Sequence, residues 1–414
     1  MDFQTKLRNY AELVVKSGCN IQKGQELYIT SPIDCAEFVR LVAESAYQAG
    51  AKQVTVGWTD ERIARLGYDY SPLEVYEKFP DWLAMLNNGM AQRDAAILSI
   101  AASDPEAMAG VDPRKPAARV KAAHEACKAF YDGMNLGKNV WCIVSAAAPA
   151  WAKKVFPDAG EPEAMERLWE AIFRAVRADQ PDPVAGWENH KCSFERKKAL
   201  LNAKQFVRMR YTNSIGTDIT IGLPENHEWA GGGAETVEGR YFFPNMPTEE
   251  IFCSPHKDRV DGTVHSAMPL NYQGNIIDDF SITFRDGRVT DFSAGKGYDT
   301  LRELIGTDEG SHRLGELALI PKTSPISEMG IIFYNTLYDE NASCHFAIGR
   351  GFAECVKGGY DMTEAQLLEA GINESATHVD FMLGTSDLNI VGIRKDGTET
   401  AVFENGDWAP EFRV

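Results

Sequence analysis

The spacing of apolar residues in the first 180 positions alternates between the periods typical of helices and of strands. The chain opens with an amphipathic helical pattern, predicted to end near residue 18 and carried by Phe3, Leu7, Tyr10 and Val14. Short apolar runs predict strands at residues 26–29, 53–56, 95–101 and 140–144. Because helical patterns lie between these runs, we predict a parallel sheet in an open α/β layer domain.

Later helical patterns mark the end of this region. One helix is predicted to carry four residues on a single face, Val120, Ala123, Cys127 and Phe130, and another is predicted at about residues 163–176. Prolines at 181 and 183 then break the pattern, and a charged helix is predicted to run to about Gln205.

The pattern after this helix is that of β-hairpins. They are predicted at residues 207–221, 282–292 and 392–403, and the second contains Asp286-Gly287, a two-residue turn signal. The 414 residues exceed the roughly 250–300 at which a single core stops growing. We therefore predict an α/β domain at 1–205 and a β-rich α+β catalytic domain at 206–414.

Composition narrows the classes of function. A net charge of -18 argues against binding to nucleic acid or to an anionic membrane, because both need clustered cations. No apolar run approaches the ~18 residues that cross a bilayer, and the first residues lack a signal-peptide pattern, so we expect a cytoplasmic location. No glycine-rich phosphate motif follows a predicted strand, so no nucleotide cofactor is indicated.

The segment 377–384, Thr-His-Val-Asp-Phe-Met-Leu-Gly, combines an apolar strand pattern with two ligand-type side chains. Side chains alternate across a strand, so His378 and Asp380 are predicted to share the face opposite the apolar residues. An isolated His-x-Asp is usually a histidine hydrogen-bonded to a neighbouring carboxylate. A metal site is the alternative, and it needs further ligands elsewhere in the chain.

Three other segments supply such residues. Glu249 and Glu250 are adjacent, so on an extended chain one of the two can face a site directly. Glu316 lies inside the apolar run 315–320, where a charge is costly unless it is paired or bound to a metal. Glu340 precedes His345 in a segment where a helix is predicted to begin near residue 341.

Together these segments offer an oxygen-rich ligand set with two imidazoles. One ion needs about four ligands, whereas two ions that share bridging carboxylates can use the whole set. Two metal ions about 3.5–4 Å apart can activate a water molecule for hydrolysis. The residues therefore suggest a dinuclear hydrolase, although spacing alone does not show that the segments converge.

Three long motifs resemble those of a known family: residues 245–250 (Asn-Met-Pro-Thr-Glu-Glu), residues 333–345 (Phe-Tyr-Asn-Thr-Leu-Tyr-Asp-Glu-Asn-Ala-Ser-Cys-His) and residues 377–384. They are similar to the signatures of the thermophilic-type metalloaminopeptidases, the family of aminopeptidase T, aminopeptidase S and PepS. The similarity extends to residues 11–15, 20–25 and 154–157, and so runs nearly from end to end.

The resemblance implies a cytoplasmic exopeptidase that releases amino-terminal residues, with broad specificity, from peptides with a free N-terminus. It implies two divalent metal ions, which are zinc, cobalt, manganese or magnesium, and a homodimer that encloses the catalytic cavity. Carried over position by position, the metal ligands are Glu250, Glu316, His345, His378 and Asp380, with Glu340 as an additional ligand of the second ion.

One position departs from the family. The family usually has a tyrosine seven residues after the metal-binding histidine at 345, and this chain has Phe352. On the predicted helix, seven residues make about two turns, so Phe352 is expected on the same face as His345. If the missing hydroxyl stabilises the transition state, its loss costs on the order of 10²–10³ in turnover. Tyr338 and Tyr360 are candidates to replace it.

Other roles and functions stay open at this point. Glu249 is a candidate proton carrier for the leaving nitrogen, and a salt bridge on the far side of its strand is the alternative. Another dinuclear amidohydrolase or a dipeptidase would use the same ligand set. A metal-binding protein with reduced turnover is a further alternative, because of Phe352.

Overall fold

The structure is a computed structural model that describes residues 1–272 and 275–414. These residues form two compact units: unit 1 comprises residues 1–189 and 233–247, and unit 2 comprises residues 190–232 and 248–414. The division into domains at residue 205 stays a prediction. Within the described residues, no helix is both long enough and apolar enough to cross a membrane.

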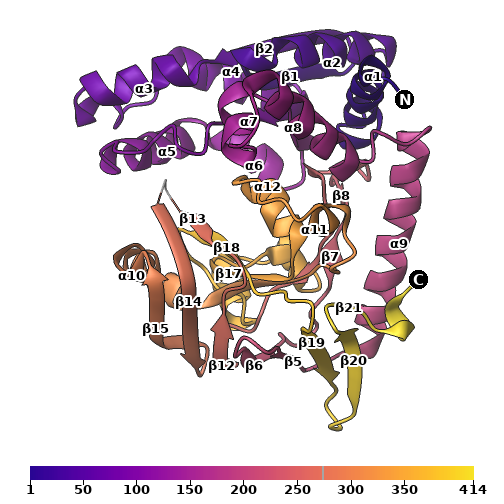
Figure 1. Cartoon of the computed structure of the whole chain (residues 1–414), viewed down its shortest axis with the longest axis vertical. Helices are drawn as coiled ribbons and strands as arrows, with labels where there is room; N and C mark the ends of the chain where they lie inside the picture. Colours follow the sequence, from indigo (N-terminus) through magenta and orange to yellow (C-terminus); the bar gives the residue numbers. More distant parts are fainter. Residues whose placement is uncertain (273–274) are drawn as a thin grey trace. The chain divides into compact units, whose positions relative to one another are not determined.

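Unit 1 is built on a parallel sheet with the strand order β10-β4-β3-β1-β2. Figure 1 shows strands β1 and β2 of this sheet in the indigo part of the chain. Strands β1, β3 and β4 are mostly buried, as expected where helices cover a parallel sheet. The strands of unit 1 have these bounds: β1 (Glu26–Pro32), β2 (Gln53–Thr59), β3 (Ala96–Ala101), β4 (Trp141–Ser145), β8 (Ala234–Glu235), β9 (Tyr241–Phe242) and β10 (Asn245–Met246).

The helices of unit 1 follow the predicted alternation with the strands, with one correction. The predicted helix through residues 120–130 is wrong, because the structure has two helices that meet at Cys127, and Val120 is exposed. The helices have these bounds: α1 (Phe3–Leu13), α2 (Ala36–Gln48), α3 (Glu61–Tyr70), α4 (Asp81–Gln92), α5 (Arg114–Ala126), α6 (Lys128–Asn135), α7 (Pro149–Val155) and α8 (Glu161–Ala175). Helix α9 (Pro183–Lys204) spans the boundary between the units and ends where the sequence predicted.

Unit 2 contains two antiparallel sheets among its described residues. One has the order β18-β17-β16-β11-β7 and is called the site sheet below. Its strands are β7 (Ala230–Gly231), β11 (Ile251–Cys253), β16 (Leu314–Leu319), β17 (His345–Gly349) and β18 (His378–Met382). The mixed fold, with a parallel sheet and antiparallel sheets, confirms the predicted fold class at this level.

The second sheet of unit 2 contains the three predicted hairpins, which are confirmed. The turn at Asp286 and Gly287 has positive φ at both residues, 49° and 77°, as a two-residue hairpin turn requires. The strands are β5 (Arg208–Thr212), β6 (Asp218–Gly222), β12 (Val260–His265), β13 (Leu270–Tyr272), β14 (Asn275–Arg285), β15 (Arg288–Lys296), β19 (Asn389–Ile393), β20 (Glu399–Glu404) and β21 (Asp407–Trp408).

The core of unit 2 fixes which face of the site sheet can carry chemistry. Leu317, Phe346 and Phe381 lie on neighbouring strands and pack into one hydrophobic cluster that also contains Tyr211 of the second sheet. The opposite face is left for the polar residues. Short helices complete the unit: α10 (Tyr298–Ile305), α11 (Pro325–Met329), α12 (Thr336–Asp339) and α13 (Glu364–Glu369).

Candidate metal centre

A row of side chains crosses three strands of the site sheet at one level. Ala347 of β17 pairs with Glu316 of β16 on one side and with Asp380 of β18 on the other. Directly opposed residues of antiparallel strands point to the same face, so the two carboxylates lie on either side of an alanine. Because Ala347 has a small side chain, it does not separate the two carboxylates.

The two histidines flank this row on the same face. His345 pairs with Ala318, and His378 pairs with Gly349. Their partners are again small, and a Cβ on Gly349 would lie 2.1 Å from the carbonyl oxygen of Thr377. The sequence therefore places large ligand-type side chains opposite small residues on one face of the site sheet.

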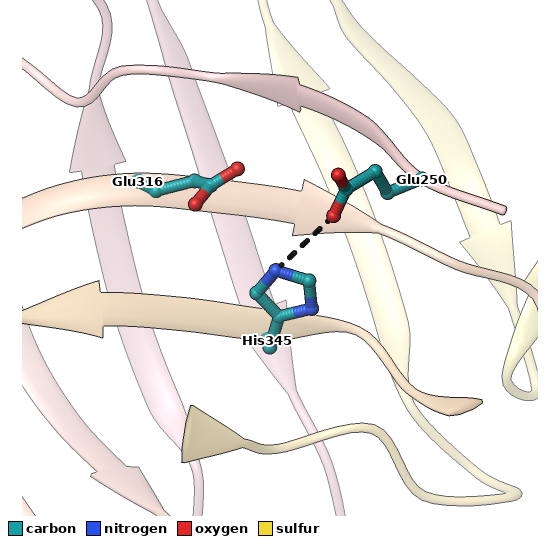
Figure 2. Close-up of side chains that lie close together, drawn as sticks. All are labelled: Glu250, Glu316 and His345. Atoms are coloured by element: carbon teal, nitrogen blue, oxygen red, sulfur yellow. Dashed lines mark ion pairs between the residues drawn. The ribbon is translucent and has the colours of Figure 1, made fainter. Parts of the chain in front are cut away.

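The ligand atoms of these residues form two overlapping groups. Glu250, Glu316 and His345 make one group, and Glu316, His378 and Asp380 make the other, with the ligand atoms of each group within 4.8 Å of one another. Figure 2 shows the Glu250 carboxylate pointing to the His345 imidazole, at 3.5 Å, while Glu316 points into the same space from its own strand. Glu316 belongs to both groups, so its carboxylate is shared by the two candidate ligand sets.

Asp380 also lies between the two histidines. Its Oδ1 is 3.3 Å from Nε2 of His378 and 3.9 Å from Nε2 of His345. This buried oxygen accepts no hydrogen bond within residues 1–272 and 275–414. A buried carboxylate oxygen without a donor is costly, and a cation at this position would satisfy it.

Backbone carbonyl groups orient both imidazoles. Nδ1 of His345 donates to the carbonyl oxygen of Glu340 at 3.0 Å, and Nδ1 of His378 donates to that of Arg350 at 2.8 Å. Since a carbonyl oxygen can only accept, each Nδ1 carries a hydrogen. Nε2 is then the ring nitrogen left to bind a cation, and Nε2 of His378 lies 3.0 Å from a carboxylate oxygen of Glu316. This arrangement is typical of metal-binding histidines.

Electrostatics distinguish the cluster from an ordinary set of ion pairs. Burial raises the pKa of Glu250 to about 8 and that of Glu316 to about 7, and burial together with Glu250 and Asp380 raises the pKa of Glu340 well above its usual range. Burial would lower the pKa of His378, but Asp380 and Glu316 raise it well above its ordinary value. The charged form of three of the four carboxylates is thus disfavoured, and divalent cations bound among them would offset that cost.

The structure corrects the predicted setting of His345. The expected helix near residue 341 is wrong: a short helix, α12, and a 3-10 turn, η5 (Glu340–Ala342), come first, and His345 begins strand β17. The reason is tertiary, because β17 hydrogen-bonds to β16 and β18 on its two sides. A local pattern could not reveal those partners.

Phe352 consequently reaches the site by a different route. It is not on a helix with His345, so the predicted helix face shared by the two residues is wrong. Phe352 follows β17 in extended conformation, before the 3-10 turn η6 (Ala353–Cys355). Its ring nevertheless lies 4.9 Å from the imidazole of His378. Tyr360, a candidate to replace the hydroxyl, donates a hydrogen bond to Glu354 at 2.9 Å.

Glu249 and Glu340 lie on segments beside the site sheet. Oε2 of Glu249 is 3.7 Å from Nε2 of His190 on helix α9, which is the salt-bridge alternative for this residue. Glu340 lies on η5 and belongs to neither three-residue group among the described residues, although its charge interacts with Glu250, Asp380 and Glu316.

Asn341 and Asp339 have structural roles that sequence reasoning missed. The Asn341 side chain is fully buried, accepts a hydrogen bond from the backbone N–H of Glu249 at 2.7 Å, and donates to the carbonyl oxygen of Leu337 at 2.9 Å. Asp339 accepts hydrogen bonds from the backbone N–H groups of Phe333 and Asn335, and burial raises its pKa to about 7. The only sequence signal was their position inside a motif, which does not separate ligands from residues that hold them.

Comparisons with known proteins agree with this geometry. The model of the family described as thermophilic metalloprotease (M29) matches residues 3–408. Aminopeptidase AmpS of Bacillus subtilis is 46% identical over 407 residues, which cover 98% of this chain and 99% of that protein. Aminopeptidase 2 of Geobacillus stearothermophilus is 44% identical over 410 residues, with 99% of each chain covered.

A solved structure extends the match to three dimensions. Wild-type AmpT from Thermus thermophilus superimposes with a TM-score of 0.92 at 39% sequence identity, over 99% of this chain and 100% of that one. A family match over nearly the whole length and relatives above 40% identity leave one conclusion. This chain belongs to the thermophilic metalloprotease (M29) family.

Proposed function

We propose that this chain is a metal-dependent aminopeptidase that removes the first residue of peptides with a free N-terminus, using two divalent metal ions. The aminopeptidase activity rests on family membership and on the names of the relatives. The observation that supports two ions is the pair of overlapping groups joined by Glu316. Four carboxylates also balance the charge of two divalent cations.

Different residues of the cluster would bind each of the two ions. Glu250 and His345 would hold one ion, and His378 and Asp380 the other, with Glu316 between them and Glu340 as an additional ligand of the second. Zinc, cobalt, manganese and magnesium remain the candidates, and ligands that combine carboxylate with imidazole suit the first three best. Bound ions would supply Lewis-acid activation of water and of the scissile carbonyl group.

The chain's own groups must still position the peptide and carry a proton. Nδ1 hydrogen bonds from both histidines hold the imidazoles in one orientation, which keeps the ligand geometry fixed during turnover. Glu249 as the carrier of a proton to the leaving nitrogen stays a prediction, and its contact with His190 favours the salt-bridge alternative. Glu249→Gln separates these roles: a proton carrier changes the pH profile of kcat, and a salt bridge changes mainly stability.

The central test combines metal content with hydrolysis. Metal-loaded protein is expected to contain two ions per chain and to cleave leucine-p-nitroanilide and unblocked peptides, but not the same peptides with an acetylated N-terminus. His378→Ala is expected to lose metal and activity, while His312→Ala, a half-buried histidine of unit 2 outside the cluster, keeps both. Loaded protein that cleaves no unblocked peptide would exclude the aminopeptidase, and cleavage restricted to dipeptides would favour a dipeptidase.

Phe352 provides a second test of the mechanism. The chain lacks the hydroxyl that the family usually has at this position, and the Phe352 ring lies beside a proposed ligand, His378. Phe352→Tyr is expected to raise kcat by on the order of 10²- to 10³-fold if that hydroxyl stabilises the transition state. An unchanged kcat would mean that another group already does so.

We further propose that the protein is a homodimer, as the resemblance implies, and that it is cytoplasmic. Helix α3 supports the dimer, because Ile63, Leu66 and Tyr70 are exposed at a spacing that puts them on one helix face. Helix α4 exposes Trp82 and Met85 in the same unit. Exposed apolar faces of this kind usually mark an interface.

A further inference from the structure

Two phenylalanine rings border the candidate metal centre on the side of His378. The Phe352 ring lies 4.9 Å from the imidazole of His378, and 5.3 Å from the ring of Phe252. Both phenylalanines are half-buried and pack against the core of unit 2. The pair is called the phenyl wall below.

Strand register places Phe252 on the same face as the ligands. Phe252 of β11 pairs with Ala318 of β16, and Ala318 pairs in turn with His345 of β17. Opposed side chains in antiparallel strands share a face. Phe252 also lies two residues after Glu250, so on the extended chain both side chains point to the same side.

The position of Phe352 is fixed by its backbone. Its N–H donates a hydrogen bond to Oγ of Ser254, at 2.8 Å, and Ser254 is fully buried just after β11. The preceding residues run close over β16, where a Cβ on Gly315 would lie 2.0 Å from the carbonyl oxygen of Arg350. The absence of a side chain at Gly315 therefore lets this segment approach the sheet and hold the Phe352 ring beside His378.

We propose that the phenyl wall contacts the first side chain of the substrate and selects peptides whose N-terminal residue is apolar or aromatic. The proposal rests on the aminopeptidase function above. The rings offer no hydrogen-bond partner, so they gain from contact with apolar atoms and give nothing to a charged side chain to offset its desolvation. An apolar substrate side chain would cover the exposed part of both rings, and that burial favours binding.

The test measures selectivity rather than activity. Values of kcat/KM for leucine- and alanine-p-nitroanilide are compared in wild type, Phe252→Ala and Phe352→Ala. Each variant is expected to lower the leucine-to-alanine ratio by about tenfold, because removal of a pocket wall affects the larger side chain most. Phe352→Tyr keeps the ring and is expected to keep the ratio, and Phe252→Leu and Phe352→Leu serve if an alanine variant does not fold.

A binding measurement separates this inference from the proposed function. Leucine hydroxamate and glycine hydroxamate share a metal-chelating group, so their affinity ratio for the metal-loaded protein reports the side chain without turnover. A wild type that cleaves no peptide but prefers the leucine compound, with that preference lost in the variants, would contradict the aminopeptidase function. The same result would support the contact between the phenyl wall and the ligand side chain. If the affinity and kcat/KM ratios both change by less than about twofold in Phe252→Ala and Phe352→Ala, the phenyl wall is overturned.

A matched variant controls for loss of any aromatic side chain. Phe292 of β15 is another half-buried phenylalanine packed on the core of unit 2, and its ring stacks on Tyr298 at 5.2 Å. Phe292→Ala is expected to leave both ratios unchanged. A ratio that falls equally in Phe292→Ala and in the phenyl-wall variants would reflect general loosening of unit 2 and would contradict the proposal.

Discussion

The two units differ in which side chains are buried and which are exposed to solvent. Within the described residues, the buried acidic and histidine side chains all belong to unit 2: His227, Glu249, Glu316, Asp339 and His345. The buried polar residues of unit 1 are neutral, as at Ser31 and Ser145. Unit 1 instead exposes large apolar side chains on α3 and α4.

This difference shows which observations point to function. A charge inside a protein is costly, so a buried cluster of acids persists where binding of a cation offsets that cost. An apolar side chain in water is costly because its hydration is unfavourable, and burial against a partner surface removes that cost. On the proposals above, unit 2 would hold the catalytic site and unit 1 would provide a surface for association.

The largest expected effect comes from the carboxylate shared by the two groups of ligands. Glu316→Gln removes the charge but keeps the size of the side chain, and it is expected to reduce kcat/KM by on the order of 10³-fold or more and to lower metal content. Elemental analysis and steady-state kinetics measure the two effects. Glu303→Gln, on the exposed side of α10, is the matched control. Full activity in Glu316→Gln would contradict a metal centre at this cluster in unit 2.

A smaller loss is expected when a residue that holds the ligand segments is changed. Asn341→Ala removes hydrogen bonds to the backbone of Glu249 and Leu337, and it is expected to weaken metal binding by about 10- to 100-fold. Titration with a chelator measures this affinity. Asn389→Ala, which removes hydrogen bonds on β19 in the second sheet, should leave it unchanged. Equal effects of the two variants would mean that Asn341 acts only on stability.

The pH dependence of stability should separate metal-free from metal-loaded protein. Burial raises the pKa of Glu250 from 4.5 to about 8 and that of Glu316 from 4.5 to about 7. Between these pH values the folded metal-free protein therefore binds more protons than the unfolded chain. The contribution of these two carboxyl groups to the free energy of unfolding is thus fully present below about pH 4.5 and is lost as the pH rises to about 8.

Thermal unfolding at several pH values checks this sign. The Tm of chelator-treated protein is expected to fall by about 5 °C or more between pH 5 and pH 8. Metal-loaded protein should not show this fall, because cations bind the ionised carboxylates. Glu250→Gln should flatten the curve of the metal-free protein. Parallel curves with and without metal would contradict a metal site at this cluster.

The smallest change in stability is expected on the apolar face of unit 1. Leu66→Glu adds a charge to the exposed side of α3, so it should alter the free energy of unfolding by no more than about 0.5 kcal/mol while it shifts the protein from dimer to monomer. Light scattering coupled to size exclusion measures the mass. Ala64→Glu adds the same charge on the other side of α3 and should leave the dimer intact. A monomeric wild type would contradict the homodimer.

Local patterns predicted much of the fold. The apolar runs gave the strands of the parallel sheet, and the Asp286-Gly287 turn has the backbone conformation that its hairpin needs. The helix through residues 120–130 was wrong, because one continuous apolar period cannot show that the chain turns at Cys127. His345 was placed on a helix for a similar reason, since the strands that pair with it are distant in sequence.

The sequence by itself determined which residues offer ligand chemistry and which strand face His378 and Asp380 share. It also determined the family, through motifs that the full-length match bears out. Both follow from short-range order, because the identity of a side chain and the alternation of a strand need no distant partner.

The tertiary structure alone decided that these residues meet. Glu316 and His378 are 62 residues apart in sequence, yet their side chains lie 3.0 Å apart, because β16, β17 and β18 pair side by side. The same pairing sets Ala347 between two carboxylates and brings Phe352 against His378. Backbone hydrogen bonds between strands join segments that are distant in sequence. The spacing of residues within one segment cannot predict which strands pair or in which register.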